Sequence, residues 1–237
     1  MPALNEAETI GGMIHALQAA RLVRIRVVDN GSTDATASLA RAAGAEVVIE
    51  PRRGYGQACW TGTRGLSREV DWILFCDADG SDRAEDVARL LAEAEKGADF
   101  VLGDRRSLPA SRVALTSVQR FGNALATTLV NWGWRHAYRD LGPLRLIQRD
   151  LYEQMGLRDR GFGWTLEMQV RAVELGATIV EIPVQYRRRL GGKSKISGTL
   201  RGSVKAGVVI LTTLVRLWLR RGWPASRPPR GLRQRSN

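Results

Sequence analysis

Short apolar runs alternate with longer amphipathic stretches through the first hundred residues. Four runs are rich in β-branched residues and end in polar turns, which predicts strands at residues 22–29, 45–50, 71–77 and 98–103. The stretches between them have helical spacing, at residues 8–20, 33–43, 57–68 and 83–96. This alternation predicts an α/β fold with a mainly parallel central sheet flanked by helices.

The second half of the chain is less regular. Helices are predicted at residues 118–134 and 163–176, a Gly-Pro loop enters a strand over residues 140–147, and a strand over residues 178–189 ends in a basic loop. A parallel sheet of this kind is expected to have an opening strand before Pro2, and the sequence lacks one. We expect one domain over residues 1–200, an amphipathic helix over 201–221 and a disordered basic tail over 222–237.

Positive charge is concentrated at the carboxyl-terminal end. The formal net charge is +12, yet residues 182–237 hold 14 Lys and Arg and no Asp or Glu, so the first 181 residues carry 22 basic and 24 acidic groups. In residues 200–221 one helical stripe carries Arg201, Lys205, Thr212, Arg216 and Arg220, and the other side carries Val208, Leu211, Val215, Trp218 and Leu219. This pattern predicts a helix lying on an anionic membrane surface; the alternative is a helix docked on the domain.

Location follows from what the sequence lacks. The longest uncharged apolar stretch, residues 206–215, has ten residues, whereas a helix needs about 20 to cross a bilayer. The two cysteines, Cys59 and Cys76, have no CxxC spacing, which favours buried thiols in a reducing compartment. We therefore expect a cytoplasmic protein that is peripheral on the inner face of the membrane.

Carboxylates gather where the third predicted strand ends, in the sequence "DADGSD". Ligands of open α/β sheets bind beside the carboxyl ends of strands, and Asp77 and Asp79 offer hard oxygen ligands for Mg²⁺ or Mn²⁺. A calcium loop of the EF-hand kind is excluded, because its sixth and twelfth positions would be Asp82 and Ala88. The alternative is a plain turn at Asp79–Gly80. Asp82 is expected to cap the helix that follows.

Four motifs occur in order with strand–helix spacing: "PALNEAETI", "VVDNGSTDAT", "RGYGQA" and "DADGSD". Together they resemble the nucleotide-sugar half of family-2 glycosyltransferases, which have a GT-A fold. Farther along, "GDR", "QRFGN", "DLGPLRLI" and "YRRRLGGKSKISGT" resemble the polyprenyl-phosphate sugar transferases, such as dolichyl-phosphate mannose or glucose synthases. The resemblance covers about residues 2–204 and is specific for the family but not for the sugar.

The resemblance implies donor-site residues. The nucleoside pocket would be lined by Pro2, Ala3, Asn5, Glu6 and Asp29. Gly54 and Gly56 would let backbone approach the nucleotide, although "GYG" alone is more often simply a loop. Asp77, with Ala78, would face the ribose and the metal, Asp79 would be the principal metal ligand, and Arg105 would belong to the donor site. Asn30 departs from the family pattern, which usually has Asp at this position.

The implied reaction is metal-dependent, inverting transfer of a hexose from UDP-glucose or GDP-mannose to a polyprenyl phosphate. A lipid phosphate is already anionic near neutral pH, since its second pKa is about 6. It needs no general base, but it needs cations, and the candidates are Arg120, Arg189 and Lys195. For each of these, the alternative is an ordinary surface charge.

Other functions are weighed against this one. A lipid or polysaccharide hydroxyl acceptor would need a carboxylate base, for which Asp140 and Glu167 are candidates; Glu167 alternatively pairs with Arg171. A polyanion-binding protein that uses the basic tail is a third hypothesis, and an inactive membrane scaffold is a fourth. Nucleic acid is not expected as a partner, because few aromatic residues stand free to stack on bases.

Overall fold

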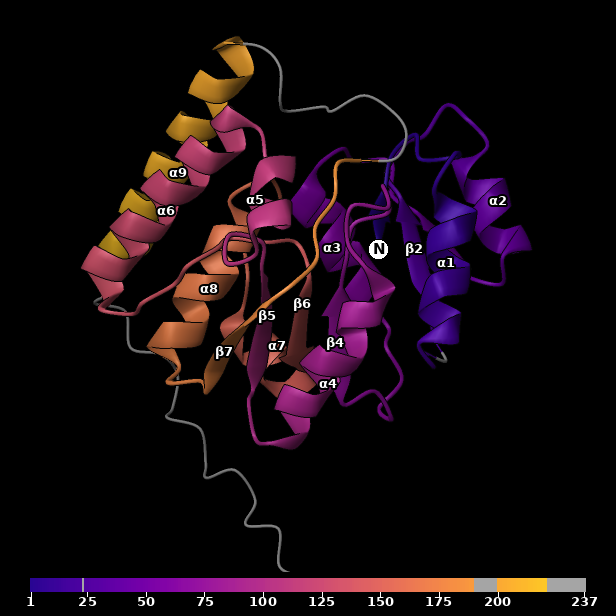
Figure 1. Ribbon diagram of the computed structural model, residues 1–237, viewed down its shortest axis with the longest axis horizontal. Helices are drawn as coiled ribbons and strands as arrows, with labels where there is room; N and C mark the ends of the chain where they lie inside the picture. The colour runs from indigo at the N-terminus through magenta and orange to yellow at the C-terminus, as the bar shows by residue number, and fades with distance from the viewer. Residues whose placement is uncertain (23, 190–199, 221–237) are drawn as a thin grey trace, which may run out of the picture.

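The computed structural model describes residues 1–22, 24–189 and 200–220. Its centre consists of two neighbouring sheets with helices around them (Figure 1). The first has the order β1-β2-β3, with strands Pro2–Ala3, Arg26–Asp29 and Glu46–Ile49. The second has the order β4-β6-β5-β7, in which β4 is Trp72–Phe75, β5 Phe100–Asp104, β6 Arg145–Gln148 and β7 Ile179–Pro183.

The sheets are mostly parallel, as the alternating pattern predicts. β2 pairs in parallel with both of its neighbours, and β5 pairs in parallel with β7. β6 is the exception, because it runs antiparallel between β4 and β5. Since β4 and β5 both flank this reversed strand, their carboxyl ends lie at the same edge of the sheet.

A short strand, β1, lies beside β2, and the predicted lack of a strand before Pro2 stays a prediction. Pro2 and Ala3 pair with Val28 and Asp29 of β2, and the Asn30 amide donates to the Ala3 carbonyl. Proline is tolerated as the first residue of a strand, where its missing N–H costs no ladder bond. Two residues are therefore enough to extend the sheet past β2.

Helices cover both faces of the sheets. Their bounds are α1 Ile10–Ala19, α2 Thr36–Ala42, α3 Tyr55–Thr63, α4 Val87–Glu95, α5 Pro109–Ala114, α6 Ser117–Trp134, α7 Arg149–Met155, α8 Trp164–Glu174 and α9 Leu200–Arg220, with a 3₁₀ turn at Ala84–Asp86. α6 begins with a capping box, in which the Thr116 hydroxyl accepts from the Gln119 amide and the Gln119 side chain accepts in return. Within the described residues, no helix is long and apolar enough to span a bilayer.

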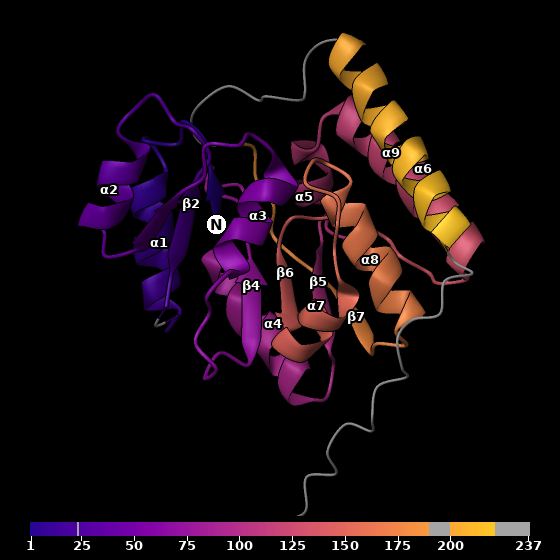
Figure 2. The same cartoon turned by 180° about the vertical axis from the view of Figure 1, so that it is seen from behind.

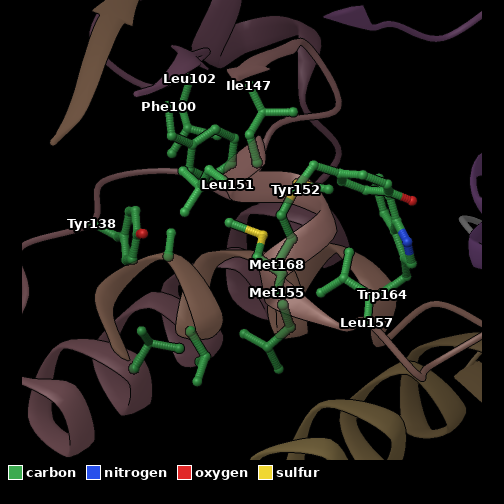
Figure 3. Packing of buried hydrophobic residues seen from close by; sticks show 14 of the residues in the cluster. Phe100, Leu102, Tyr138, Ile147, Leu151, Tyr152, Met155, Leu157, Trp164 and Met168 are labelled. Atoms are coloured by element: carbon green, nitrogen blue, oxygen red, sulfur yellow. The ribbon is translucent and has the colours of Figure 1, made fainter. Parts of the chain in front are cut away.

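The largest apolar cluster fills the space between the second sheet and helices α6 to α8 (Figure 3). Trp164 of this cluster is fully buried and meets the Phe75 ring edge-on at a centroid distance of 4.9 Å. Leu214 and Leu217 of α9 belong to the same cluster. α9 is therefore packed on the domain through one side, and Figure 2 shows it lying along α6. The division at residue 200 stays a prediction, and residues 222–237 lie outside the described part.

Candidate active site at the carboxyl ends of the strands

The loop after β4 folds back on itself. The Asp82 carboxylate accepts from the backbone N–H of Asp77 at 3.0 Å, and Asp79 accepts from the Ser81 N–H at 2.9 Å. The prediction that Asp82 caps the following helix is wrong, because the helical turn starts at Ala84 and has no side-chain cap bond. Asp82 instead closes the loop that presents the other two carboxylates. It is almost fully buried, and burial with the nearby Asp77 charge raises its pKa well above the ordinary value.

Asp77 is held by a residue that the sequence analysis did not select. The hydroxyl of Tyr55, the first residue of α3, donates to Asp77 Oδ1 at 3.2 Å. Burial, followed by the charge of Asp79, raises the pKa of Asp77 to about 6. Tyr55 stands between the two glycines of "RGYGQA", and only those glycines were considered. Its contribution depends on α3 turning toward β4, which one sequence does not reveal.

Asp79 meets a cation from the opposite end of the chain. The guanidinium of Arg189 bridges two carboxylates, with Nη2 at 3.0 Å from Asp79 Oδ2 and Nη1 at 2.9 Å from Glu6 Oε1. The Asp79 side chain is 7% exposed and that of Arg189 28%. The structure thus joins three residues that the sequence assigned to different parts of the site: the nucleoside pocket, the metal and the acceptor.

The loops expected to hold the nucleoside are fastened to each other. Asn5 has a left-handed backbone (φ 53°), and its side-chain oxygen accepts from the Thr33 N–H at 2.8 Å. The Glu6 N–H donates to the Thr36 hydroxyl, and Asp29 Oδ1 accepts from the Ser32 N–H, both at 2.8 Å. The loop that follows β1 and the loop that follows β2 therefore form one unit.

The same unit is tied to the carboxylate loop through one hydroxyl. Thr9, at the start of α1, donates to the carbonyl of Ala78 at 2.8 Å. Ala78 is buried between the two carboxylates of its loop. Pro2 and Ala3 of β1 and Asp29 at the end of β2, which are assigned to the nucleoside, therefore lead into loops that are joined to the proposed metal ligands.

Asn30 replaces a carboxylate for a visible reason. Its amide nitrogen donates to the carbonyls of Glu50 and Arg52 at 3.0 and 2.8 Å, and its oxygen accepts from the Gly54 N–H at 2.8 Å. A carboxylate can accept but cannot donate, so Asp at this position would leave both carbonyls without this partner. Asn30 connects the end of β2 to the segment 50–54.

Gly54 and Gly56 allow another part of the chain, residues 160–164, to approach them closely. A Cβ on Gly54 would stand 2.5 Å from the Arg160 carbonyl oxygen, and one on Gly56 would stand 2.6 Å from the Trp164 Cβ. The Gly56 N–H also donates to the Gly161 carbonyl at 3.1 Å. These glycines therefore let the loop before α8 pack against α3, whereas the resemblance assigned their small size to the nucleotide. Nucleotide contact by the two residues stays a prediction.

The substitution Gly56→Ala is expected to lower the free energy of unfolding by about 1–3 kcal/mol, the usual cost of overpacking. Gly12 provides the matched control, because it also lies in a helix and a Cβ there would meet nothing within 4 Å. Gly12→Ala is expected to stabilise the fold by about 0.5–1 kcal/mol. Urea unfolding of both variants measures the difference, and equal midpoints would contradict the packing role.

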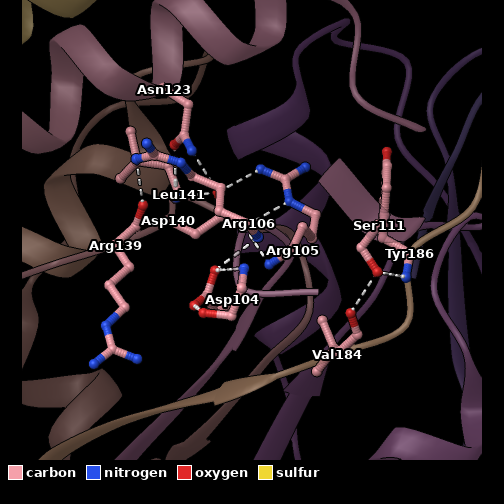
Figure 4. A network of polar contacts seen from close by, with 12 residues as sticks. Asp104, Arg105, Arg106, Ser111, Asn123, Arg139, Asp140, Leu141, Val184 and Tyr186 are labelled. Carbon is pink, nitrogen blue, oxygen red and sulfur yellow. Dashed lines mark hydrogen bonds and ion pairs between the residues drawn. The ribbon is translucent and has the colours of Figure 1, made fainter. Parts of the chain in front are cut away.

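Arg105 and Asp140 are paired with each other (Figure 4). Arg105 donates to Asp140 through its backbone N–H, Nε and Nη2, each at 2.8 Å. Burial alone would raise the pKa of Asp140, but the charge and hydrogen bonds of Arg105 hold it below its ordinary value. Asn123 and Leu141 donate to the same carboxylate. Asp140 is thus a structural ion-pair partner and a poor general base, and Arg105 is turned toward it.

Glu167 also has a structural partner. Its Oε2 accepts from the backbone N–H groups of Arg158 and Asp159 at 2.9 and 2.7 Å, and the residue is 4% exposed. The expected pairing with Arg171 is wrong, because Arg171 donates to Glu174 at 2.6 Å. Asp140 and Glu167, the two carboxylates predicted as bases for a hydroxyl acceptor, are therefore occupied in holding backbone or side chains in place.

The remaining acceptor candidates are not gathered with Arg189. Arg120 lies exposed in the first turn of α6, where it donates to the Ser117 hydroxyl at 3.2 Å. Within the described residues it makes no ion pair with Asp77 or Asp79. Lys195 lies outside the described residues. The roles of both side chains stay predictions.

The carboxylate oxygens of Asp77 and Asp79 suit a divalent metal ion that takes few of its ligands from protein. No group of three or more His, Cys, Asp or Glu suited to a metal occurs in the described ranges. Asp77 and Asp79 nevertheless bring two carboxylates into a buried loop, and burial has already raised the pKa of Asp77. Magnesium and manganese accept such sites, completing their coordination with water and substrate phosphates. The residues therefore fit the ion that the sequence predicts.

Comparisons with known proteins agree with this geometry. The sequence pattern of glycosyl transferase family 2 matches residues 1–156. An uncharacterized glycosyltransferase of Mycobacterium tuberculosis is 41% identical over 210 residues, covering 87% of this chain and 92% of the relative. An undecaprenyl-phosphate mannosyltransferase of Micrococcus luteus is 34% identical over 230 residues, covering 88% of this chain and 90% of the relative.

Solved structures supply the fold. Glucosyl-3-phosphoglycerate synthase of Mycobacterium tuberculosis, in complex with Mn²⁺, UDP and phosphoglyceric acid, superposes with a TM-score of 0.70. It is 22% identical, and the likeness covers 95% of this chain and 78% of that one. The α/β fold predicted from the sequence is confirmed as GT-A-like. The chain belongs to glycosyl transferase family 2 and is a nucleotide-sugar-dependent glycosyltransferase.

Proposed function

We propose that this glycosyltransferase moves a hexose from a nucleotide-diphosphate sugar to a polyprenyl phosphate, with inversion at the anomeric carbon. The observation that carries the proposal is the contact of Arg189 with Asp79. It brings the cation of the predicted acceptor side against the carboxylate of the predicted donor side. The undecaprenyl-phosphate mannosyltransferase of Micrococcus luteus supports the choice of acceptor.

In this scheme the acceptor phosphate oxygen forms a bond to the anomeric carbon while the bond to the nucleoside diphosphate breaks. Asp79 and Asp77 would hold a Mg²⁺ or Mn²⁺ ion, which stabilises the leaving diphosphate as a Lewis acid. Glucosyl-3-phosphoglycerate synthase has been solved with Mn²⁺ and UDP, which favours this assignment. Arg189 would hold the acceptor phosphate, because its planar guanidinium can bind two oxygens at once.

The occupied carboxylates favour phosphate over hydroxyl as the acceptor. A hydroxyl must lose its proton to a base, and Asp140 and Glu167 are both held by other donors. A phosphate monoester is already anionic at neutral pH and needs only cations to position it. The proposal therefore uses Arg189 and does not require either carboxylate as a base.

The membrane would be where the acceptor is met. α9 keeps apolar and basic side chains exposed on the side that does not face the core, which supports a peripheral position on the inner membrane face. Partition of the full chain into vesicles with anionic lipid tests this part separately from catalysis.

The deciding experiment presents purified protein with Mn²⁺, a panel of nucleotide sugars and either a short-chain polyprenyl phosphate or the corresponding polyprenol. Formation of lipid-linked hexose from the phosphate but not from the alcohol supports the proposal. Transfer to the alcohol, or to a sugar polymer with no transfer to the phosphate, would favour a hydroxyl acceptor. Release of free hexose with every acceptor would discard both.

Metal binding is expected to strengthen by about tenfold between pH 5 and pH 7, because binding must displace the proton from Asp77. Burial and Asp79 raise the pKa of this carboxyl to about 6. Without metal, the same shift lowers the free energy of unfolding as the pH rises toward 6, since the unfolded chain loses this proton first. Calorimetric titration with Mn²⁺ checks the affinity, and Asp77→Asn should bind more weakly without the pH step.

A further inference from the structure

Two helices that contain no acidic residue, α6 and α9, lie next to each other. Residues 105–139 hold no Asp or Glu, and neither do residues 182–237. The first segment includes α6 and the second α9, and the two helices lie side by side along one flank of the molecule (Figures 1 and 2). This flank, formed by α6 and α9 and called here the α6–α9 flank, has no carboxylate side chain on either helix.

α9 divides into a buried side and an apolar exposed side. Thr213, Leu214 and Leu217 are buried against the domain. The exposed apolar residues recur at helical spacing and are 48–71% exposed: Val208, Leu211, Val215, Trp218 and Leu219. Packing on the domain therefore buries only one side of this helix. The second apolar side is exposed in the described structure.

α6 adds aromatic side chains to the same flank. Trp132 is 83% exposed and Phe121 72%, while Ala126 and Val130 of this helix are fully buried. Eleven large apolar side chains are exposed among the described residues, and seven of them belong to α6 and α9. Such concentration on two adjacent helices marks an interaction surface, since single exposed apolar residues are normal but gathered ones are not.

The charges of the flank select its partner. Arg120 and Arg135 at the ends of α6, and Arg216 and Arg220 of α9, are all exposed. Arg216 forms an ion pair with Asp159, with Nη1 at 4.0 Å from Oδ2. Tryptophans beside arginines around an apolar strip match the headgroup level of an anionic bilayer, where the rings and the cations both find partners.

We propose that the α6–α9 flank docks on an anionic membrane, with both helices lying in the interface. The inference deepens the proposed function and rests on it, because the lipid acceptor would be met at this surface. α6 links the proposed acceptor site to the docking surface, because Arg120, proposed for the acceptor phosphate, is followed directly by the exposed Phe121. Docking through two helices fixes how the protein is rotated on the membrane, which one helix alone would leave open.

The test measures binding of the full chain to phosphatidylcholine vesicles with and without phosphatidylglycerol. Trp132→Ser is expected to weaken binding to the anionic vesicles by about tenfold, because it removes an aromatic anchor of one of the two helices. Ile49→Ser is the matched control, since Ile49 is also an exposed apolar residue (53%) but lies on β3. A solvent-sensitive fluorophore on Trp132→Cys should shift to the blue on vesicles, and one on Ile49→Cys should not.

Each outcome decides the proposal. Equal binding of Trp132→Ser and the control, or no fluorescence shift at position 132, would overturn the role of α6. Dimerisation of the wild-type chain that Trp132→Ser abolishes would assign the flank to a second copy instead. Transfer to a short-chain acceptor in detergent is measured in parallel and should be unchanged by Trp132→Ser. Its absence in the wild type would defeat the proposed function while leaving membrane docking to be judged on the vesicles.

Discussion

Replacing Asp79 by alanine is expected to reduce hexose transfer by roughly a thousandfold, as loss of one strong transition-state interaction does. Asp79 is the buried carboxylate whose Oδ2 faces Arg189 and whose Oδ1 is held by the Ser81 backbone. Its removal would take away the proposed principal ligand of an ion that would stabilise the leaving diphosphate. Transfer assays at saturating Mn²⁺ and calorimetric titration with Mn²⁺ measure the two effects.

Asp71→Ala is the matched control for this variant. Asp71 is exposed and immediately precedes β4, at the end opposite to the carboxylate loop. It should leave both transfer and metal affinity unchanged. Asp79→Ala should also remain folded, because losing Asp79 relieves the repulsion that helps to raise the pKa of Asp77. Full transfer by a folded Asp79→Ala variant would discard the metal role of this residue.

Arg189→Gln is expected to change metal binding and transfer in opposite directions. Arg189 lies against Asp79 Oδ2, so a metal ion that takes this oxygen must displace the guanidinium. Removing the cation should tighten Mn²⁺ binding by about three- to tenfold, a modest factor because the pair is partly exposed to solvent. Transfer should fall by about a hundredfold, since the acceptor phosphate would lose a charge-assisted contact.

Two further variants sharpen this prediction. Arg189→Lys keeps the charge but cannot bridge Glu6 and Asp79 as a planar guanidinium does, so it should impair acceptor use more than nucleotide binding. Arg188→Gln removes an exposed neighbouring cation and should affect neither. Weaker Mn²⁺ binding by Arg189→Gln would contradict competition for Asp79. A larger effect of Arg189→Lys on the nucleotide would move Arg189 to the donor side.

The sequence was most informative where the chemistry lies within a few residues. The alternation of strands and helices predicted the α/β layers, and the polar turns after β2 and β4 predicted the edge at which the loops gather. The place of Asp79 in a loop at this edge could be predicted because its neighbours in sequence are also its neighbours in the loop, and its role as a metal ligand stays a prediction. The reversed direction of β6 was not predicted, because a strand of four residues carries no sequence signal for its direction.

Residues whose role depends on a distant partner were harder to interpret. Asp82 looked like a helix cap, yet it closes the loop onto Asp77. Arg105 and Asp140 were assigned to separate tasks and turn out to be partners 35 positions apart. Arg145 gave no signal at all: it is fully buried, and its Nε and Nη2 donate to the Gly142 carbonyl. Such pairings are set by packing, which a single sequence does not record.

The hydrogen bonds of Asn30 hold the loops of the proposed nucleoside site in a way that does not depend on pH. Its amide has no proton to gain or lose near neutral pH, so its three hydrogen bonds to Glu50, Arg52 and Gly54 are the same in acid and in neutral solution. Asp77, by contrast, changes charge near pH 6. Acidification should therefore weaken metal binding at the proposed ligands, while the loop proposed to hold the nucleoside keeps its shape. Mild acid would therefore reduce metal binding reversibly without unfolding the loops around Asn30.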